Sequence, residues 1–575
     1  MFAALKPFEP RKFIPAQIDL GDWARIEPLL DRLEAELKKV GSLEQLKAWL
    51  LTSSEFSAAI AQESSMRYIA MTCQTDDPER EKAFLHFVEN IEPKLKPRSF
   101  RLEQLLVENP FFENLDKTEY GVFKRKVRTH VELFRPENVP LETEETKLGQ
   151  QYQKLVGTMT AQYDGREQTL PQLARYLEEP ARNIRHEVFE LMVRRRVQDR
   201  EALDRIFDEL LKLRVQIAQN AGFDNYRDYV FRRYERFDYT PADCEAFQKA
   251  VEVFIVPLAR RIQEDRKREL GLDVLRPWDL SVDPKNRPPL RPFRESGELI
   301  SKTQNVFDRL DPHLAANFRL MSTQDLLDLT NRKGKAPGGY QSTLQEARVP
   351  FIFMNAVGLH RDVETLLHES GHAFHSLAAR ELALNDYRHA PIEFCEVASM
   401  SMELLAADHL DQFYSPEDKR RAQLGHLKDI VGLFSWIAQI DAFQHWIYLN
   451  PGHTRKERTR AWLELTQRFG GIEDWSGYEF CRETLWHKQL HVFEVPFYYI
   501  EYGIAQLGAL QIWQNARRDL NKTLGQYRHA LSLGGSRPLP ELFQAAGIRF
   551  DFSEATIRPL IEAVRKEYER LSQES

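Results

Sequence analysis

The stretch "TLLHESGHAFHS", residues 365–376, carries three histidines at helical spacing. His368 and His372 are four residues apart, so on a helix they lie on one face, one turn above each other. Two imidazoles in this arrangement can bind one Zn²⁺ at about 2.0–2.1 Å. Glu369 is turned away from this face and could accept a proton from water without ligating the metal. The stretch therefore predicts a metal-binding catalytic helix.

The third histidine, His375, offers a competing ligand pair with His372. That pair would leave Glu369 badly placed as a base, so we favour His368 and His372 as the ligands. For His375 we expect either a supporting position beside the site or simple burial. Gly371 costs about 1 kcal/mol relative to alanine inside a helix, which predicts that another group approaches its backbone closely.

A third ligand is expected on a second predicted helix, "RHAPIEFCEVASMSMELLAADHL", residues 388–410. Pro391 is a favoured residue for its first turn, and Glu393 and Glu396 follow within the first turns. A buried carboxylate there would require a cation or a hydrogen-bond donor, whereas an exposed one is stabilised by the helix dipole alone. The chemistry of these residues does not decide whether Glu393 or Glu396 is a metal ligand.

A cluster of aromatic residues in "HVFEVPFYYIEY", residues 491–502, could supply hydrogen-bond donors to a reacting carbonyl group. On a helix that starts at Pro496, Tyr502 shares a face with Tyr498 or Tyr499, which lie four and three residues before it. A donor placed in advance stabilises an oxyanion by about 3–4 kcal/mol. Tyrosine pairs are as often core residues with one wet edge, and composition alone leaves both functions open.

The rest of the chain predicts a mainly α fold with a small β element. Apolar residues recur at three- and four-residue spacing in several segments. The clearest of these segments are 23–40, 80–95 and 202–222. An Asp-Gly turn within 158–170 predicts a hairpin, and the short apolar run 348–357 predicts a strand before the histidine helix. We expect a helical N-terminal domain over 1–180 and a catalytic domain over 181–575.

Composition excludes several other classes of protein. The 575 residues carry a net charge of −7, so no basic field points to nucleic acid. The four cysteines are far apart, which is typical of a reducing compartment. The most apolar stretch, residues 431–449, is interrupted by Gln439, Asp441, Gln444 and His445 and predicts a buried helix, not a membrane span. With no signal-peptide pattern at residues 1–15, we expect a soluble cytoplasmic protein whose oligomeric state is open.

The histidine stretch, residues 365–376, and the glutamate stretch, residues 388–410, together resemble the sequence of a known family. "HESGHAFHS" followed by "PIEFCEVASM" is similar to the paired signature of the thimet oligopeptidase and oligoendopeptidase F family of zinc peptidases. The glycine-rich "GKAPGGYQS", residues 334–342, resembles the family's loop beside the substrate, although Pro337 and small residues stand where we expect a basic residue. The length of the chain favours the oligoendopeptidase F branch.

The resemblance implies the fold and the ligand set. It implies a helical ellipsoid with a deep central substrate channel around a thermolysin-like zincin core. It also makes Glu396 the third ligand of one Zn²⁺ ion, with Glu393 as a neighbour. "HVFEVPFYYIEY" is similar to the family's histidine and tyrosine cluster. That similarity implies that the following residues contact the substrate or the oxyanion: His491, Tyr499, Tyr502 and, third in order, Tyr498.

These expectations combine into a function. We expect a zinc endopeptidase that hydrolyses short oligopeptides, with Glu369 as general base. One alternative is a gluzincin exopeptidase, which should show a group that captures a free amino terminus, and the sequence has no distinctive acidic motif for it. Another is a non-catalytic peptide-binding relative, but a pure binder has no need of Glu369.

Overall fold

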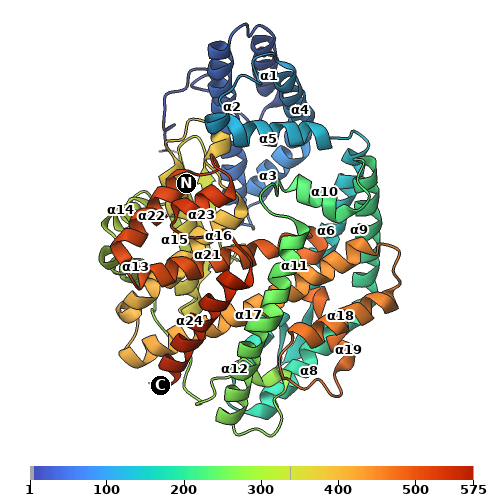
Figure 1. The fold of residues 1–575 in the computed structure, drawn as a ribbon, viewed down its shortest axis with the longest axis vertical. Helices are drawn as coiled ribbons and strands as arrows, with labels where there is room; N and C mark the ends of the chain where they lie inside the picture. Colours follow the sequence, from blue (N-terminus) through green and yellow to red (C-terminus); the bar gives the residue numbers. More distant parts are fainter. Residues whose placement is uncertain (1–4, 337, 574–575) are drawn as a thin grey trace. The chain divides into compact units, whose positions relative to one another are not determined.

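The computed structural model describes residues 5–336 and 338–573, so Pro337 lies outside the described residues. Figure 1 shows a chain built mostly of helices, which confirms the predicted fold class. The helix predicted at 202–222 is α9 (Arg200–Asn220), and Gly222 follows it with a φ of +85°. A positive φ costs glycine little, so the helix can end there.

The helix predicted over 80–95 is two helices in the structure. Helix α3 (Pro78–Asn90) ends before Ile91, and α4 (Glu92–Glu108) begins after it. Pro93 stands at the start of α4. Proline has no N–H to donate, and its ring collides with the preceding turn. This residue separates two helices that the apolar spacing alone would have joined.

The chain forms two compact units, each made from three segments. The first contains residues up to 132, 290–423 and 505–550, and the second contains 133–289, 424–504 and the residues from 551. The predicted division after residue 180 remains a prediction.

The elements of the first unit are α1 (Trp23–Lys38), α2 (Leu43–Cys73), α3, α4, α5 (Lys117–Leu133), α13 (Ser296–Leu310), α14 (Pro312–Thr323), β3 (Leu327–Thr330), β4 (Tyr340–Leu344), β5 (Val349–Ala356), α15 (His360–Ala379), α16 (Ile392–Ala406), α22 (Leu520–Ser532) and α23 (Leu539–Ala545). Those of the second are α6 (Asn138–Gly157), β1 (Thr160–Tyr163), β2 (Arg166–Thr169), α7 (Leu170–Ala174), α8 (Arg182–Gln198), α9, α10 (Tyr226–Arg233), α11 (Pro241–Ala250), α12 (Val256–Glu269), α18 (Arg455–Phe469), α19 (Glu479–Arg482), α20 (Leu490–Glu494) and α24 (Glu554–Gln573). Helix α5 extends by its last residue, Leu133, into the second unit, and helices α17 (Pro416–Leu449) and α21 (Ile500–Ala516) run through a boundary between the units.

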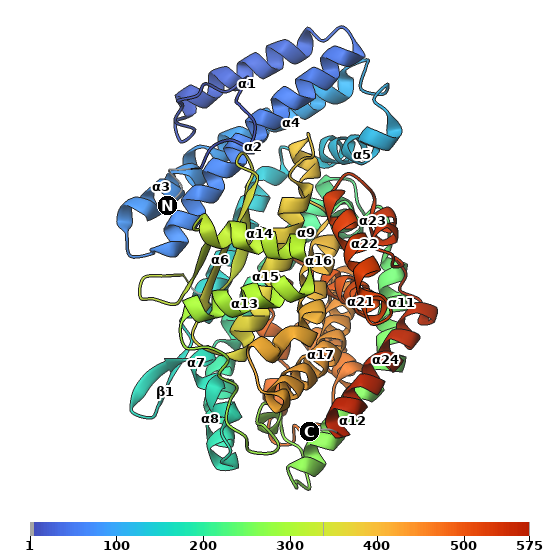
Figure 2. The ribbon, with the colours of Figure 1, turned by 90° about the vertical axis from the view of Figure 1, so that its left-hand side faces the viewer.

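Both predicted β elements are confirmed. Strands β1 and β2 form an antiparallel hairpin whose turn residues, Asp164 and Gly165, both have positive φ. Positive φ at both positions is typical of an Asp-Gly hairpin turn, and Figure 2 shows the hairpin extending away from α7 and α8. In the first unit, β5 lies between β3, which is parallel to it, and β4, which is antiparallel.

A carboxylate fixes the start of α15 directly after β5. Asp362 accepts hydrogen bonds from the backbone N–H groups of Val357, Gly358 and Leu359 at 2.8–2.9 Å. These bonds occupy donors in the connection from the strand and place a negative charge at the positive end of the helix dipole. The strand thus sets the position at which the histidine helix begins.

Helices α15 and α16 cross at Gly371, with α22 and α23 beside them in Figure 1. A Cβ atom at Gly371 would lie 2.5 Å from Ser399 Cα and 2.6 Å from the carbonyl oxygen of Ala398. This confirms the close backbone approach predicted from a glycine within a helix. Tyr527 of α22 donates a hydrogen bond from its hydroxyl group to the same Ala398 oxygen at 2.8 Å.

Within the described ranges, no helix combines the length and the apolar character needed to cross a membrane. Residues 431–449 lie in α17, where Phe434, Ile437 and Ile440 are fully buried.

We expect Gly371→Ala to lower the free energy of unfolding by about 3 kcal/mol or more, because the added methyl group meets backbone atoms that cannot move aside. Gly432→Ala is the matched control in the interior of α17, where nothing lies within 4 Å of the new methyl group. The control should raise stability by about 0.5–1 kcal/mol. Equilibrium denaturation measures both changes, and equal stabilities for the two variants would contradict the close crossing.

Candidate metal centre and tyrosine segment

The crossing of α15 and α16 brings together His368, His372 and Glu396. Oε2 of Glu396 lies 3.4 Å from Nε2 of His368 and 3.7 Å from Nε2 of His372. Bonds of about 2.0–2.2 Å to a tetrahedral zinc ion separate neighbouring ligand atoms by about 3.3–3.6 Å. Two imidazoles and one carboxylate, at these separations, fit the coordination of Zn²⁺.

The two glutamates that the residue chemistry left open differ in the structure. Both Glu393 and Glu396 are buried near the start of α16. In the described part of the chain, the ligand group at this crossing contains Glu396 and not Glu393. Ser399 donates a hydrogen bond to Oε2 of Glu396 at 3.0 Å, which orients the carboxylate.

Glu403 is a neighbour of the centre that sequence reasoning missed. Its Oε1 lies 2.6 Å from Nδ1 of His368. A carboxylate at this distance keeps the proton on Nδ1 and leaves the Nε2 lone pair for a metal. A sequence signal existed, because Glu403 follows Glu396 by seven residues, which is two turns of α16.

The carboxylates of Glu396 and Glu403 favour a positive charge at His368. Burial lowers the pKa of His368, but the hydrogen bond to Glu403 and the charges of Glu403 and Glu396 raise it more, to about 9. The pKa of His372 is well below its ordinary value because of burial and because of the neighbouring His368 charge. A group of carboxylates that stabilises a cation on one imidazole provides suitable electrostatics for a divalent ion.

Glu369 lies beside the centre without joining its ligand group. Burial raises the pKa of its carboxyl group to about 7, and the charge of Glu396 also raises it. A carboxyl group that titrates near neutral pH can both accept and deliver a proton there.

His375 is a buried packing residue and does not belong to the group of candidate metal ligands. Its side chain is 4% exposed, and its ring centre lies 5.8 Å from that of Phe394. Burial and the neighbouring His389 lower its pKa to about 3. Of the two positions expected for His375, simple burial fits these contacts better.

We expect His375 to reduce stability below neutral pH. The unfolded chain takes up a proton at His375 below about pH 6.5, whereas the folded chain does so only near pH 3. Stability present above pH 6.5 is therefore lost as the pH falls toward 3, by about 1.4 kcal/mol per pH unit. Denaturation with a chelator present, from pH 6 to pH 4, should give a steeper loss for the wild type than for His375→Gln. Parallel losses would contradict this assignment.

The predicted tyrosine helix starts later than expected. Tyr498 and Tyr499 precede α21, which begins at Ile500. The prediction of a helix that starts at Pro496 is therefore wrong. Phe497 has a φ of +67°, a left-handed conformation that no helix can contain. Only Tyr502 lies on α21, so helical spacing does not bring the three tyrosines together.

Buried side chains hold Phe497 in this conformation. Its N–H donates to Oε1 of Gln444 at 2.7 Å, and its carbonyl oxygen accepts from Nη2 of Arg236 at 2.5 Å. The same Arg236 nitrogen donates to Glu501 at 2.8 Å. A positive φ at a bulky residue is strained, and these buried bonds to both backbone groups offset that strain.

The turn nevertheless gathers the predicted aromatic residues around His491. The His491 ring centre lies 4.7 Å from that of Tyr499, 5.8 Å from that of Tyr498 and 5.9 Å from that of Tyr502. Burial raises the pKa of Tyr499 to about 12, so its hydroxyl group keeps its proton. All four residues belong to the second unit.

A chain of hydrogen bonds sets the tautomer of His491. Nε1–H of Trp436 donates to Oε1 of Gln489 at 2.7 Å, which identifies the other amide atom of Gln489 as nitrogen. That nitrogen lies 2.6 Å from Nδ1 of His491. Burial lowers the pKa of His491 to about 4, so the ring is neutral and Nδ1 accepts the bond. Nε2 therefore carries the ring proton and can donate it.

Comparison with known proteins shows the family of the chain. Residues 175–560 match Peptidase family M3, and residues 13–134 match the Peptidase M3 N-terminal domain. A solved structure of PZ peptidase A with an inhibitor has a TM-score of 0.89 and 28% identity, covering 97% of this chain and 99% of that one.

Two curated relatives are oligopeptidases by name. The chromosomal oligoendopeptidase F of Lactococcus lactis subsp. cremoris is 24% identical over 55% of this chain and 52% of its own length. The group B oligopeptidase PepB of Streptococcus agalactiae serotype III is 25% identical over 42% and 41%. The chain thus spans about half the length of these relatives. With a family match over most of its length, the chain belongs to Peptidase family M3, and the predicted likeness to the oligoendopeptidase F branch is confirmed.

Proposed function

We propose that the protein is a zinc-dependent endopeptidase that hydrolyses internal bonds of short oligopeptides. The observation that carries this proposal is the convergence of His368, His372 and Glu396 around one point, with Glu369 beside them and outside the ligand group. Membership of a peptidase family and the oligopeptidase names of the relatives support it.

In this proposal, His368, His372 and Glu396 would hold one Zn²⁺ ion. When bound, the ion would make a water molecule more acidic and polarise the scissile carbonyl group. Glu369 accepts the proton of the attacking water and delivers it to the leaving amine. A carboxyl group with a pKa near 7 suits both transfers at neutral pH.

Hydrogen-bond donors to the substrate are proposed on the tyrosine segment. His491 would donate through Nε2–H, and Tyr499 and Tyr502 would donate through their hydroxyl groups, with Tyr498 as a third candidate. A neutral imidazole with one fixed tautomer and a phenol with a raised pKa are donors at neutral pH. The ellipsoid with a deep central channel, the cytoplasmic location and the two-domain division remain predictions.

The deciding assay uses a fluorogenic peptide that is internally quenched and blocked at both ends. We expect internal cleavage that a chelator abolishes and that added Zn²⁺ restores. Cleavage of free-ended peptides alone would favour an exopeptidase instead. Zinc binding without any cleavage would favour a non-catalytic peptide-binding protein.

Glu369→Gln should retain bound zinc and lose at least about 10³-fold in kcat, because an amide cannot accept the proton. Glu364→Gln is the control on the same helix, where the side chain pairs with His360 at 3.2 Å, and its kcat should stay within a few-fold of the wild type. Metal content and kcat are measured on the same preparations. Substantial activity in Glu369→Gln would remove this residue from the mechanism.

Glu403→Gln should weaken zinc binding by about 10–100-fold, because the ring proton of His368 loses its charged acceptor. Glu403→Ala should weaken it further, since no acceptor remains. Competition with a chromophoric chelator measures both affinities. Unchanged affinity in both variants would show that Glu403 does not support the zinc ligand.

A further inference from the structure

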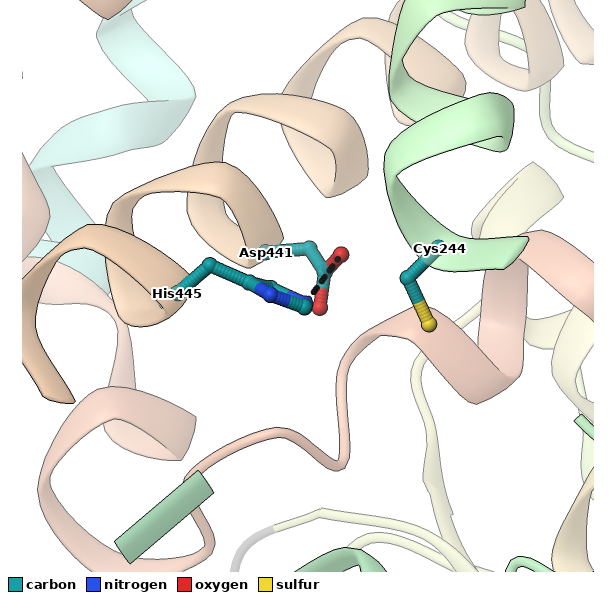
Figure 3. A group of neighbouring side chains, drawn as sticks. All are labelled: Cys244, Asp441 and His445. Atoms are coloured by element: carbon teal, nitrogen blue, oxygen red, sulfur yellow. Dashed lines mark ion pairs between the residues drawn. The ribbon is translucent and has the colours of Figure 1, made fainter. Parts of the chain in front are cut away.

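A second group of possible metal ligands lies in the second unit, apart in sequence from the first. It consists of Cys244 on α11 with Asp441 and His445 on α17. Figure 3 shows Asp441 and His445 projecting from neighbouring turns of α17 on the side that faces Cys244. One ligand atom from each residue lies within 4.8 Å of the others, and Nε2 of His445 is 3.4 Å from Oδ2 of Asp441.

These side chains are buried and incompletely paired. Cys244 is 1% exposed, Asp441 0% and His445 5%. Gln248 donates to Oδ2 of Asp441 at 2.7 Å. In the described part of the chain, Oδ1 of Asp441 and both ring nitrogens of His445 make no hydrogen bond.

The surroundings make this arrangement costly. Rings of Phe497 and Phe231 contact the His445 ring edge-on, at centre distances of 5.3 and 6.2 Å. A buried polar group without a hydrogen bond costs about 1–3 kcal/mol, and a buried carboxylate needs a cation or several donors. One donor from Gln248 satisfies only part of this requirement.

We propose that Cys244, Asp441 and His445 bind a divalent metal ion of the zinc class, separate from the ion at His368. A thiolate and an imidazole select Zn²⁺ over Mg²⁺ or Ca²⁺, which prefer oxygen ligands. A thiolate and a carboxylate balance the two positive charges of the ion, with the imidazole neutral. The separation of 3.4 Å between the histidine and aspartate atoms matches the edge of a tetrahedral zinc site.

The position of this group indicates a structural ion and not a catalytic one. Its ligands are almost completely buried, which leaves no open face for a substrate. The ion would join α11 to α17 next to Gln444, which lies between two of the ligands in sequence and accepts the bond from Phe497 N–H. The predicted consequence is a more rigid support for the left-handed turn before the tyrosines.

The test uses Co²⁺ as a spectroscopic substitute for Zn²⁺. Expression in cobalt-supplemented medium loads the buried site during folding. We expect two cobalt ions per chain and a thiolate-to-cobalt charge-transfer band in the near ultraviolet. The group at His368 contains no sulfur ligand, so this band reports the second site alone.

Variants assign the band. The double variant His368→Ala/His372→Ala should retain one cobalt ion and the full band. Cys244→Ser should lose the band, whereas Cys481→Ser, which removes another buried cysteine of the same unit, should keep it.

Folded wild-type protein without the band would overturn the proposal, even where Cys244→Ser fails to fold. A band that persists in folded Cys244→Ser would also overturn it. So would a folded double variant that holds no cobalt.

Discussion

The candidate metal centre depends on one steric constraint, the contact of two helix backbones at Gly371. Helix α15 carries both imidazoles and α16 carries the carboxylate, so their separation sets the geometry of all three ligand atoms. Ser399 and Ala398 occupy the space that a side chain at position 371 would need. The backbone of one helix thus serves as the packing surface of the other. When the ligands lie on two helices, the distances between them vary as the two helices move relative to each other. A contact between two backbones allows little such movement, because no flexible side chain lies between them.

The two candidate functional regions use buried polar side chains for different purposes. Around His368, carboxylates surround an imidazole and stabilise positive charge. Around Phe497, an amide and a guanidinium hold a backbone conformation that the residue itself disfavours. Both arrangements cost desolvation energy, and that cost is offset only while each bond is made. The positions of the candidate catalytic residues are therefore coupled to buried hydrogen-bond partners such as Glu403, Gln444 and Arg236.

Local patterns in the sequence were enough to predict the histidine helix, the hairpin and the strand, because each depends on residues close together in the chain. Glu396 was chosen over Glu393 only through the family resemblance, since both lie near the start of one helix. Gln444 and Gln489 could not be identified, because their partners come from other elements. The tyrosine helix was misplaced because nothing in "VPFYY" signals a positive φ at Phe497. Asp441 and His445 were visible only as polar interruptions of an apolar stretch, and Cys244 stands 197 residues before Asp441 in the sequence.

The assembly of the first unit from three separate segments has a consequence for biosynthesis. Residues 505–550 supply α22 and α23, which pack beside α15 and α16. The hydroxyl group of Tyr527 donates to the same carbonyl oxygen of Ala398 that a side chain at position 371 would meet. A ribosome delivers this segment more than one hundred residues after Glu396, the candidate metal ligand of α16. The nascent chain therefore carries all three candidate ligands of the first centre long before α22 and α23 can pack beside α15 and α16. During this interval the crossing of α15 and α16 lacks the support that these two helices provide.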